Sequence, residues 1–196
     1  LSRRLKRVGA ALGLEIAVHA CDGRQPIGRG IGPALEAHDV LRVLRNEPDA
    51  PSDLRERALD IAAKVLDFEP ATSGESGRHR AETLLASGAA WRKFEAICNA
   101  QGGLREPPVA PQRFDVVASV AGVVDTIDNR RLATAAKLAG APRDAAAGLV
   151  LHAPLGTAVE PGQPLFTLHA QALGELDYAR AYIDGHRDIV HVGAPP

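Results

Sequence analysis

A glycine-rich loop between a predicted strand and a predicted helix is the part of this sequence best suited to hold an ion. The segment QPIGRGIGPALEA covers residues 25–37 and contains Gly28, Gly30 and Gly32. A loop of this kind at a helix N-terminus points free N–H groups at an anion, and its bent backbone turns carbonyl groups toward a cation. A tight turn that only packs the helix against the strand is the alternative interpretation.

Acidic and imidazole side chains are the other groups that could do chemistry. Asp22 and Asp39 flank the loop, and Asp39 follows Glu36 by about one helical turn, close enough to reach back to the loop. A solvated carboxylate on the helix surface is the alternative. His152 and His169 lie at the ends of two segments predicted to pair as strands, so they could face each other. Two histidines are too few ligands for a metal site, which favours a structural role.

The sequence contains no recognisable set of catalytic residues. The sequence suggests no Ser/His/Asp or Cys/His arrangement and no carboxylate pair of the glycosidase type. Its formal net charge is −1, without the basic excess that nucleic-acid binding requires. No apolar run approaches the ~20 residues of a membrane span. The two cysteines, Cys21 and Cys98, lack metal-site spacing. We therefore expect a cytoplasmic protein that binds neither nucleic acid nor membranes.

The elements that position the loop are predicted from periodicity. Apolar and polar residues alternate over 14–20, which predicts a strand before the loop. After the loop, Pro33 can open an amphipathic helix over 34–44. A basic amphipathic helix over 2–12 precedes both. Residues 1–105 are thus interpreted as the tail of an α/β domain, whose other strands we expect before Leu1, so that the chain is the C-terminal part of a longer protein.

Further helices are predicted in the first half of the chain. Asp53 and Glu56 have the spacing of a capping box at the start of a helix. Pro70 and the cluster over 72–77 predict a break, and residues 81–86 start the next helix. A further helix carries Trp91, which we expect to be a core anchor, and ends at the glycine pair 102–103.

The period of the pattern changes after a proline-rich linker at residues 106–112, and residues 113–196 are predicted to form a second domain. Strands are expected over 114–119, 122–127, 149–152, 165–170 and 189–192. Helices are expected after Asn129, as the cap, and over 176–183. The fold class is therefore α/β in the broad sense, with α+β character. The predicted core of the second domain consists of Val116, Val123, Ile127, Leu132, Leu149, Leu151, Leu165 and Leu168.

Several segments in the same order resemble one enzyme family. QPIGRGIGPALEA is similar to the QPLG…GNALE segment of the pyrimidine and thymidine nucleoside phosphorylases, and closer still to the archaeal-type branch that includes AMP phosphorylases. The resemblance continues through SGAAWRKFE at 87–95, AQGG at 100–103, AG at 121–122, IDNR at 127–130, and GLVLH at 148–152, with VEPGQPL and LHA following. Blocks that keep their order over nearly the whole chain are far more specific than any one of them.

This resemblance implies a fold and an activity. It implies that residues 113–196 form an α/β-hammerhead domain. The intact protein would be a thymidine phosphorylase, which uses inorganic phosphate to cleave a nucleoside into free base and (deoxy)ribose 1-phosphate. AMP phosphorylase is the alternative within the family. The family's catalytic residues would lie before Leu1, so this chain alone is expected to be inactive. The resemblance further implies a dimer and no required cofactor.

One ion site is implied by the same resemblance. Pyrimidine-type members hold a cation with two loop carbonyls and an acidic side chain. On this sequence these ligands are the carbonyls of Ile27 and Gly30 and the side chain of Asp39, where those members have Glu. The ion would be structural, potassium or another monovalent or divalent cation, since hard cations take oxygen ligands.

A non-catalytic function is the alternative from another class of protein. The second domain also resembles the biotinyl and lipoyl carrier fold, so an interaction or carrier module fits the same strands. A carrier needs a lysine on an exposed hairpin, whereas the only lysine after residue 93 is Lys137, inside a predicted helix. The missing attachment residue argues against the carrier interpretation.

Overall fold

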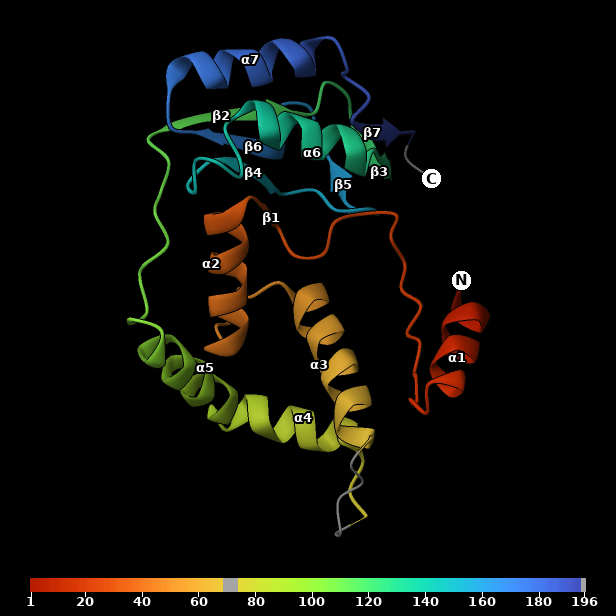
Figure 1. Ribbon diagram of the computed structural model, residues 1–196. Helices are drawn as coiled ribbons and strands as arrows, with labels where there is room; N and C mark the ends of the chain where they lie inside the picture. Colours follow the sequence, from red (N-terminus) through yellow and green to blue (C-terminus); the bar gives the residue numbers. More distant parts are fainter. Residues whose placement is uncertain (69–73, 195–196) are drawn as a thin grey trace.

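Seven helices and seven strands are found in the residues that the computed structural model describes, 1–68 and 74–194 (Figure 1). The first half contains mainly helices: α1 (Ser2–Ala11), β1 (Gly30–Ile31), α2 (Pro33–Leu44), α3 (Ser52–Asp67), α4 (Gly77–Ala86) and α5 (Ala89–Ala100). The second half is mixed: β2 (Gln112–Val117), β3 (Gly122–Ile127), α6 (Asn129–Leu138), β4 (Gly148–Leu151), β5 (Ala158–Val159), β6 (Pro164–Ala170), α7 (Leu173–Asp184) and β7 (Val190–Gly193).

The strands form two antiparallel sheets. The four-stranded sheet has the order β1-β4-β6-β2, and the three-stranded sheet has the order β5-β3-β7. In the larger sheet, Gly148 on β4 and Gln112 on β2 pair with His169 and Ala170 of the central strand β6. The two strands predicted on either side of residues 121–122 therefore belong to different sheets. Helices and antiparallel sheets together give the α+β class that the sequence predicts.

The main core lies between the sheets and helices α6 and α7, and it confirms most of the predicted core positions. Leu132, Leu149 and Leu168 are completely inaccessible to solvent. On β3 the inward-facing residue is Val124, which is 1% exposed, whereas the predicted Val123 is only half-buried. An irregularity in the pairing with β7 interrupts the strict alternation of β3 between Val124 and Thr126.

Helices α2 to α5 form a smaller cluster beneath the four-stranded sheet, on the side away from α7 (Figure 1). Its buried residues are Val43, Leu59, Ala81 and Leu85. Helix α5 buries none of its residues, so Trp91 is not the core anchor that the sequence predicts. The indole is half-buried and packs against the guanidinium of Arg45, 4.7 Å from the ring centre.

Several local predictions are corrected by the structure. Residues 14–20 are not in a strand, because no neighbouring strand in the described chain satisfies their backbone groups. Helix α3 begins after Pro51, so Asp53 lies inside its first turn instead of capping it. The cap of α6 is Asp128, which accepts two backbone N–H groups, and not Asn129.

The fourth helix begins earlier than predicted. Helix α4 begins at Gly77, and the Ser76 side chain caps it by accepting the N–H of His79. Pro70 and Thr72, which the sequence places in the break, lie outside the described residues. Irregular backbone leads from the end of α5 to β2 and includes all of the proposed linker except Gln112, which already belongs to β2. No helix in the described part of the chain is long and apolar enough to cross a membrane.

Candidate functional site

The N–H groups of the glycine-rich loop are bound by the protein's own carboxylates. Asp39, which is only 5% exposed, accepts the backbone N–H groups of Arg29 at 2.6 Å and Gly30 at 2.7 Å with its Oδ2 atom. Asp53 accepts the N–H of Gly28 at 3.2 Å, and Glu36 reaches back to accept that of the next glycine, Gly32. These donors are occupied, so the loop itself does not form the anion cradle that its glycine spacing allows.

Glycine is required in this loop for two different reasons. Gly28 and Gly32 have φ values of +80° and +138°, which side chains disfavour. Gly30 has no such angle, but a Cβ atom there would lie 2.8 Å from the backbone nitrogen of Glu36 and closer still to Leu35. The first turn of α2 therefore passes directly over Gly30, and any side chain would displace the loop from the helix.

The loop is also tied to the second half of the chain. Strand β1 places Gly30 and Ile31 opposite Val150 and Leu149 of β4, and the carbonyl of Arg29 accepts the N–H of Leu151 at 2.8 Å.

Three further hydrogen bonds extend this connection along the chain. The N–H of Ala34, at the start of α2, donates to the carbonyl of Ala145 at 2.9 Å. The side chains of Gln25 and Asn129 each make a hydrogen bond of 2.8 Å across the junction, to Leu155 and Gly23 respectively. The loop and the C-terminal sheet therefore form one connected unit.

The predicted cation ligands are only partly brought together. Gly30 donates its N–H, and not its carbonyl, to Asp39, and the Oδ2 atom of Asp39 accepts only N–H groups in the described part of the chain. Ile27 lies half-buried in the same loop. Among residues 1–68 and 74–194, no three His, Cys, Asp or Glu side chains gather to hold a metal. A cation bound by two carbonyls and the remaining oxygen of Asp39 stays a prediction.

A polar cluster occupies the four-stranded sheet opposite its core face. The Thr167 hydroxyl donates to Asp115 at 2.5 Å and lies 2.7 Å from Nε2 of His152. Since the single hydroxyl proton goes to Asp115, the His152 ring must donate its own Nε2 proton to the Thr167 oxygen. His169 follows two residues later on the same face. The two predicted histidines thus share one face of the sheet, with Thr167 between them.

The sequence alone did not single out Arg113 and Asp115, the remaining members of this cluster. The available signal was period-two spacing: residues 113 and 115 on β2, and 167 and 169 on β6, have to share faces of their strands. Pairing Arg113 with His169 brings the two sets together.

A cavity of about 510 Å³ separates this polar face from α2. The loop and α2 contribute Arg29, His38 and Arg42 to its lining, and the sheet contributes Arg113, His152 and His169. His169 is 8% exposed, and its burial, followed by the charges of Arg113 and His152, lowers its pKa. Three of the lining residues are arginines and one, Asp39, is acidic, so the cavity is predominantly basic.

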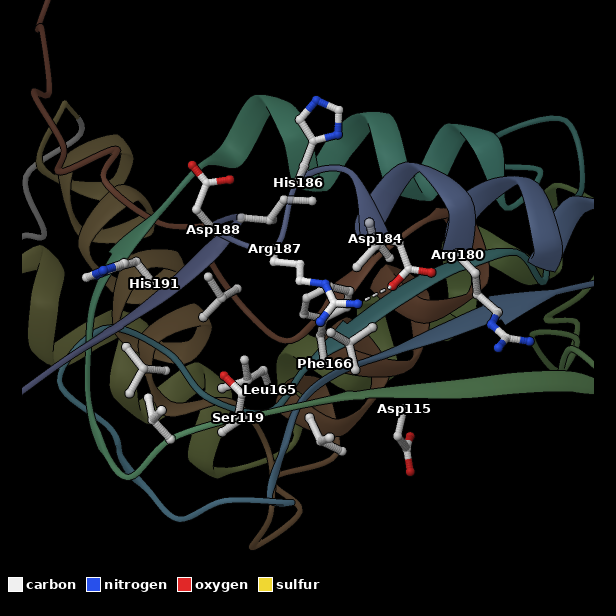
Figure 2. A pocket seen from close by; sticks show the side chains of 18 of the residues that line it. Asp115, Ser119, Leu165, Phe166, Arg180, Asp184, His186, Arg187, Asp188 and His191 are labelled. Atoms are coloured by element: carbon white, nitrogen blue, oxygen red, sulfur yellow. Dashed lines mark hydrogen bonds and ion pairs between the residues drawn. The ribbon is translucent and has the colours of Figure 1, made fainter.

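A second cavity, of about 490 Å³, lies between β2, α7 and β7 (Figure 2). Figure 2 shows its charged rim, where Arg187 forms an ion pair with Asp184 at 3.3 Å, and its apolar base, which includes Phe166. Both side chains of this ion pair are exposed, so the pair contributes little to stability. This groove presents no group of side chains arranged for catalysis in the described chain.

Comparison with known proteins shows which enzymes the chain resembles. Residues 123–189 match the family model of the pyrimidine nucleoside phosphorylase C-terminal domain. A protein of Acidovorax sp. (strain JS42) named "Putative thymidine phosphorylase 1" is 56% identical over 192 residues, covering 98% of this chain and 38% of that protein. Proteins named "Putative thymidine phosphorylase" from Polaromonas sp. (strain JS666 / ATCC BAA-500) and Legionella pneumophila are 56% and 50% identical over 192 and 196 residues.

These matches cover nearly the whole chain and agree with the α+β fold of its second half. Residues 123–189 thus match the C-terminal domain of the pyrimidine nucleoside phosphorylases, and nearly the whole chain is similar to proteins named putative thymidine phosphorylase. It spans less than two fifths of the length of the curated relatives it matches, 38% of the Acidovorax protein.

Proposed function

We propose that the protein containing this chain is a thymidine phosphorylase of the cytoplasm. It would use inorganic phosphate to cleave the N-glycosidic bond of thymidine, releasing thymine and deoxyribose 1-phosphate. The observation that carries this proposal is the 56% identity over 192 residues to a protein named for that activity. The substrates would then be a nucleoside and phosphate, and we propose a homodimer as the working form.

Within that enzyme, we propose that this chain supports the parts of the protein that close around the substrates. Phosphorolysis requires the active site to close, because water competes with phosphate for the oxocarbenium-like centre. The hydrogen bond from Ala34 to Ala145 and the β1–β4 pairing support this role, since they join the glycine loop to the C-terminal sheet. A connected unit can transmit closure without bending at the loop. The catalytic groups would lie in the remainder of the protein.

The experiment is to purify the full-length protein and follow base release by chromatography. Thymine should appear from thymidine only when phosphate is present, together with an equal amount of deoxyribose 1-phosphate. AMP serves as the competing substrate. Phosphate-dependent release of adenine from AMP, without release of thymine, would replace the proposal with the AMP phosphorylase alternative. Absence of both reactions would contradict both of these phosphorylase assignments and favour a non-catalytic interaction module.

A further inference from the structure

The basic cavity between α2 and the four-stranded sheet contains a buried polar atom without a partner. Nδ1 of His169 has no hydrogen-bond partner among the residues that the structure describes, although the residue is only 8% exposed. Leaving a buried ring nitrogen unpaired costs free energy, so such atoms call for an explanation. The ring lines the cavity between α2 and the sheet, where a bound molecule could supply the missing partner.

An unpaired cation lies beside this histidine. Arg113 is directly opposite His169 in the β2–β6 pairing, and within the described chain no carboxylate lies within ion-pair distance of its guanidinium. Asp115, the acidic residue nearest along β2, already accepts the Thr167 hydroxyl. Arg113 and His169 therefore line the same part of the cavity, one with an unpaired guanidinium and the other with an unpartnered ring nitrogen. Guanidinium and imidazole N–H groups together are typical ligands of a tetrahedral oxyanion.

The opposite wall adds positive charge. Arg42 of α2 lines the cavity, and its contacts with Glu47 and Asp49 are long, at 3.9 and 3.6 Å. Exposed ion pairs of this length are weak and leave the guanidinium free to turn toward a ligand. Asp39 is the acid on this wall, and two backbone N–H groups offset its charge. An anion entering the cavity would meet guanidinium groups from both sides.

The cavity is larger than an inorganic anion requires. Its volume of about 510 Å³ is within the range of small-molecule sites, roughly 300–1,000 Å³. Leu35, Val109 and Val150 add apolar surface beside the basic groups. We propose that this cavity binds a phosphate monoester of a small organic molecule, with the phosphate held by Arg113 and His169 and the organic part against the apolar residues.

The test uses calorimetric titration of the full-length protein with ribose 5-phosphate, inorganic phosphate and ribose. The binding that depends on Arg113 should be at least tenfold tighter for ribose 5-phosphate than for inorganic phosphate, and ribose should not bind. Arg113→Gln should weaken the binding of ribose 5-phosphate by tenfold or more, because it removes the unpaired charge. Arg105→Gln, which changes an exposed arginine outside the cavity, is the matched control and should leave the affinity unchanged.

His169→Asn provides a second variant at the unpartnered atom. Circular dichroism should first show that it is folded, and it should also weaken binding by tenfold or more. Ribose 5-phosphate affinity that ignores the Arg113 change would overturn the proposal, whatever the behaviour of His169→Asn. Arg113-dependent binding of inorganic phosphate alone would overturn the assignment of an organic phosphate. Thymine release is measured separately, so failure of this site and failure of the proposed activity can be told apart.

Discussion

Gly32 and Gly148 lie directly against each other where the loop meets strand β4. A Cβ atom on Gly32 would be 3.2 Å from the Cα of Gly148, and one on Gly148 would be 3.1 Å from the Cα of Gly32. Both residues also have positive φ angles, +138° and +144°. The contact between the two halves of the chain thus depends on two glycines, whose backbone angles and close approach both disfavour a side chain.

Gly148→Ala is therefore expected to lower the free energy of unfolding by at least about 2 kcal/mol, since backbone strain and overpacking each cost about 1–3 kcal/mol. Urea denaturation measures the loss. Gly156→Ala is the matched control: Gly156 has φ +85° with nothing within 4 Å of the added Cβ, so only the backbone cost of about 1–2 kcal/mol applies. Equal losses in the two variants would contradict the proposed contact.

Replacing Leu168 tests whether β6 faces the core of the C-terminal half as described. It is completely buried on β6, so Leu168→Ala should destabilise the protein by about 2–5 kcal/mol in urea denaturation. Leu173 is 62% exposed at the start of α7, and its replacement by Ala should change stability by less than about 0.5 kcal/mol. A loss below about 0.5 kcal/mol at Leu168 would show that the facing of β6 is wrong.

The lowered pKa of His169 is expected to make the stability of the protein depend on pH. Its burial, with the charges of Arg113 and His152, lowers its pKa below the unfolded value of about 6.5. The unfolded chain then binds this proton more tightly than the folded one. This contribution to stability is complete above about pH 6.5 and is lost as the pH falls through the lowered pKa. Urea midpoints across this range should fall less steeply for His169→Gln than for the wild type, whereas His19→Gln, at an exposed position, should behave as the wild type.

Replacing Asp39 tests both its role in holding the glycine-rich loop and the predicted cation site. Asp39→Asn should lower stability by about 1–3 kcal/mol, because a charged acceptor of two buried N–H groups is lost. In the full-length protein, replacing tetramethylammonium by potassium should raise the melting temperature, and the variant should lose this response. Asp49→Asn, which changes an exposed acid, is the control. A wild type whose melting temperature and activity ignore the choice of cation would leave Asp39 with a purely structural role.

The chain alone should be catalytically inactive. We expect the 196-residue chain to release no thymine from thymidine, no uracil from uridine and no adenine from AMP when phosphate is supplied, because the family's catalytic groups would lie outside it. Chromatography against a buffer blank measures this. Phosphate-dependent release of any of the three bases would show that the catalytic groups lie within residues 1–196.

Local chemistry allowed much of the fold to be predicted. Pro33 opens α2 as expected, and β3 has the predicted bounds, Gly122–Ile127, because proline geometry and period-two alternation act within a few residues. Strand pairing was not predictable in the same way. Alternation shows that 14–20 suits a strand, but the segment has no partner strand in this structure and stays irregular.

The candidate site follows the same division. His152 and His169 could be singled out because they end two predicted strands, whereas Arg113 and Thr167 became neighbours of these residues only through the register of β2 and β6. The predicted capping role of Asp53 is wrong for a related reason, since a contact distant in sequence replaces it. The spacing of Asp53 to Glu56 fits a capping box, but in the structure its carboxylate accepts the N–H of Gly28, 25 residues away, and contacts the guanidinium of Arg29.

The pairing of β1 with β4 has a consequence for the order of events during synthesis. Gly30 emerges from the ribosome long before its partner Val150, and β4 itself needs β6, which ends at Ala170. Contacts between such distant parts of a chain form late, because the intervening loop must close first. The β1 part of the glycine loop therefore stays unpaired until β4 and β6 have been synthesised, and a ribosome stalled before residue 170 would carry a loop held only by the carboxylates of Asp39, Asp53 and Glu36.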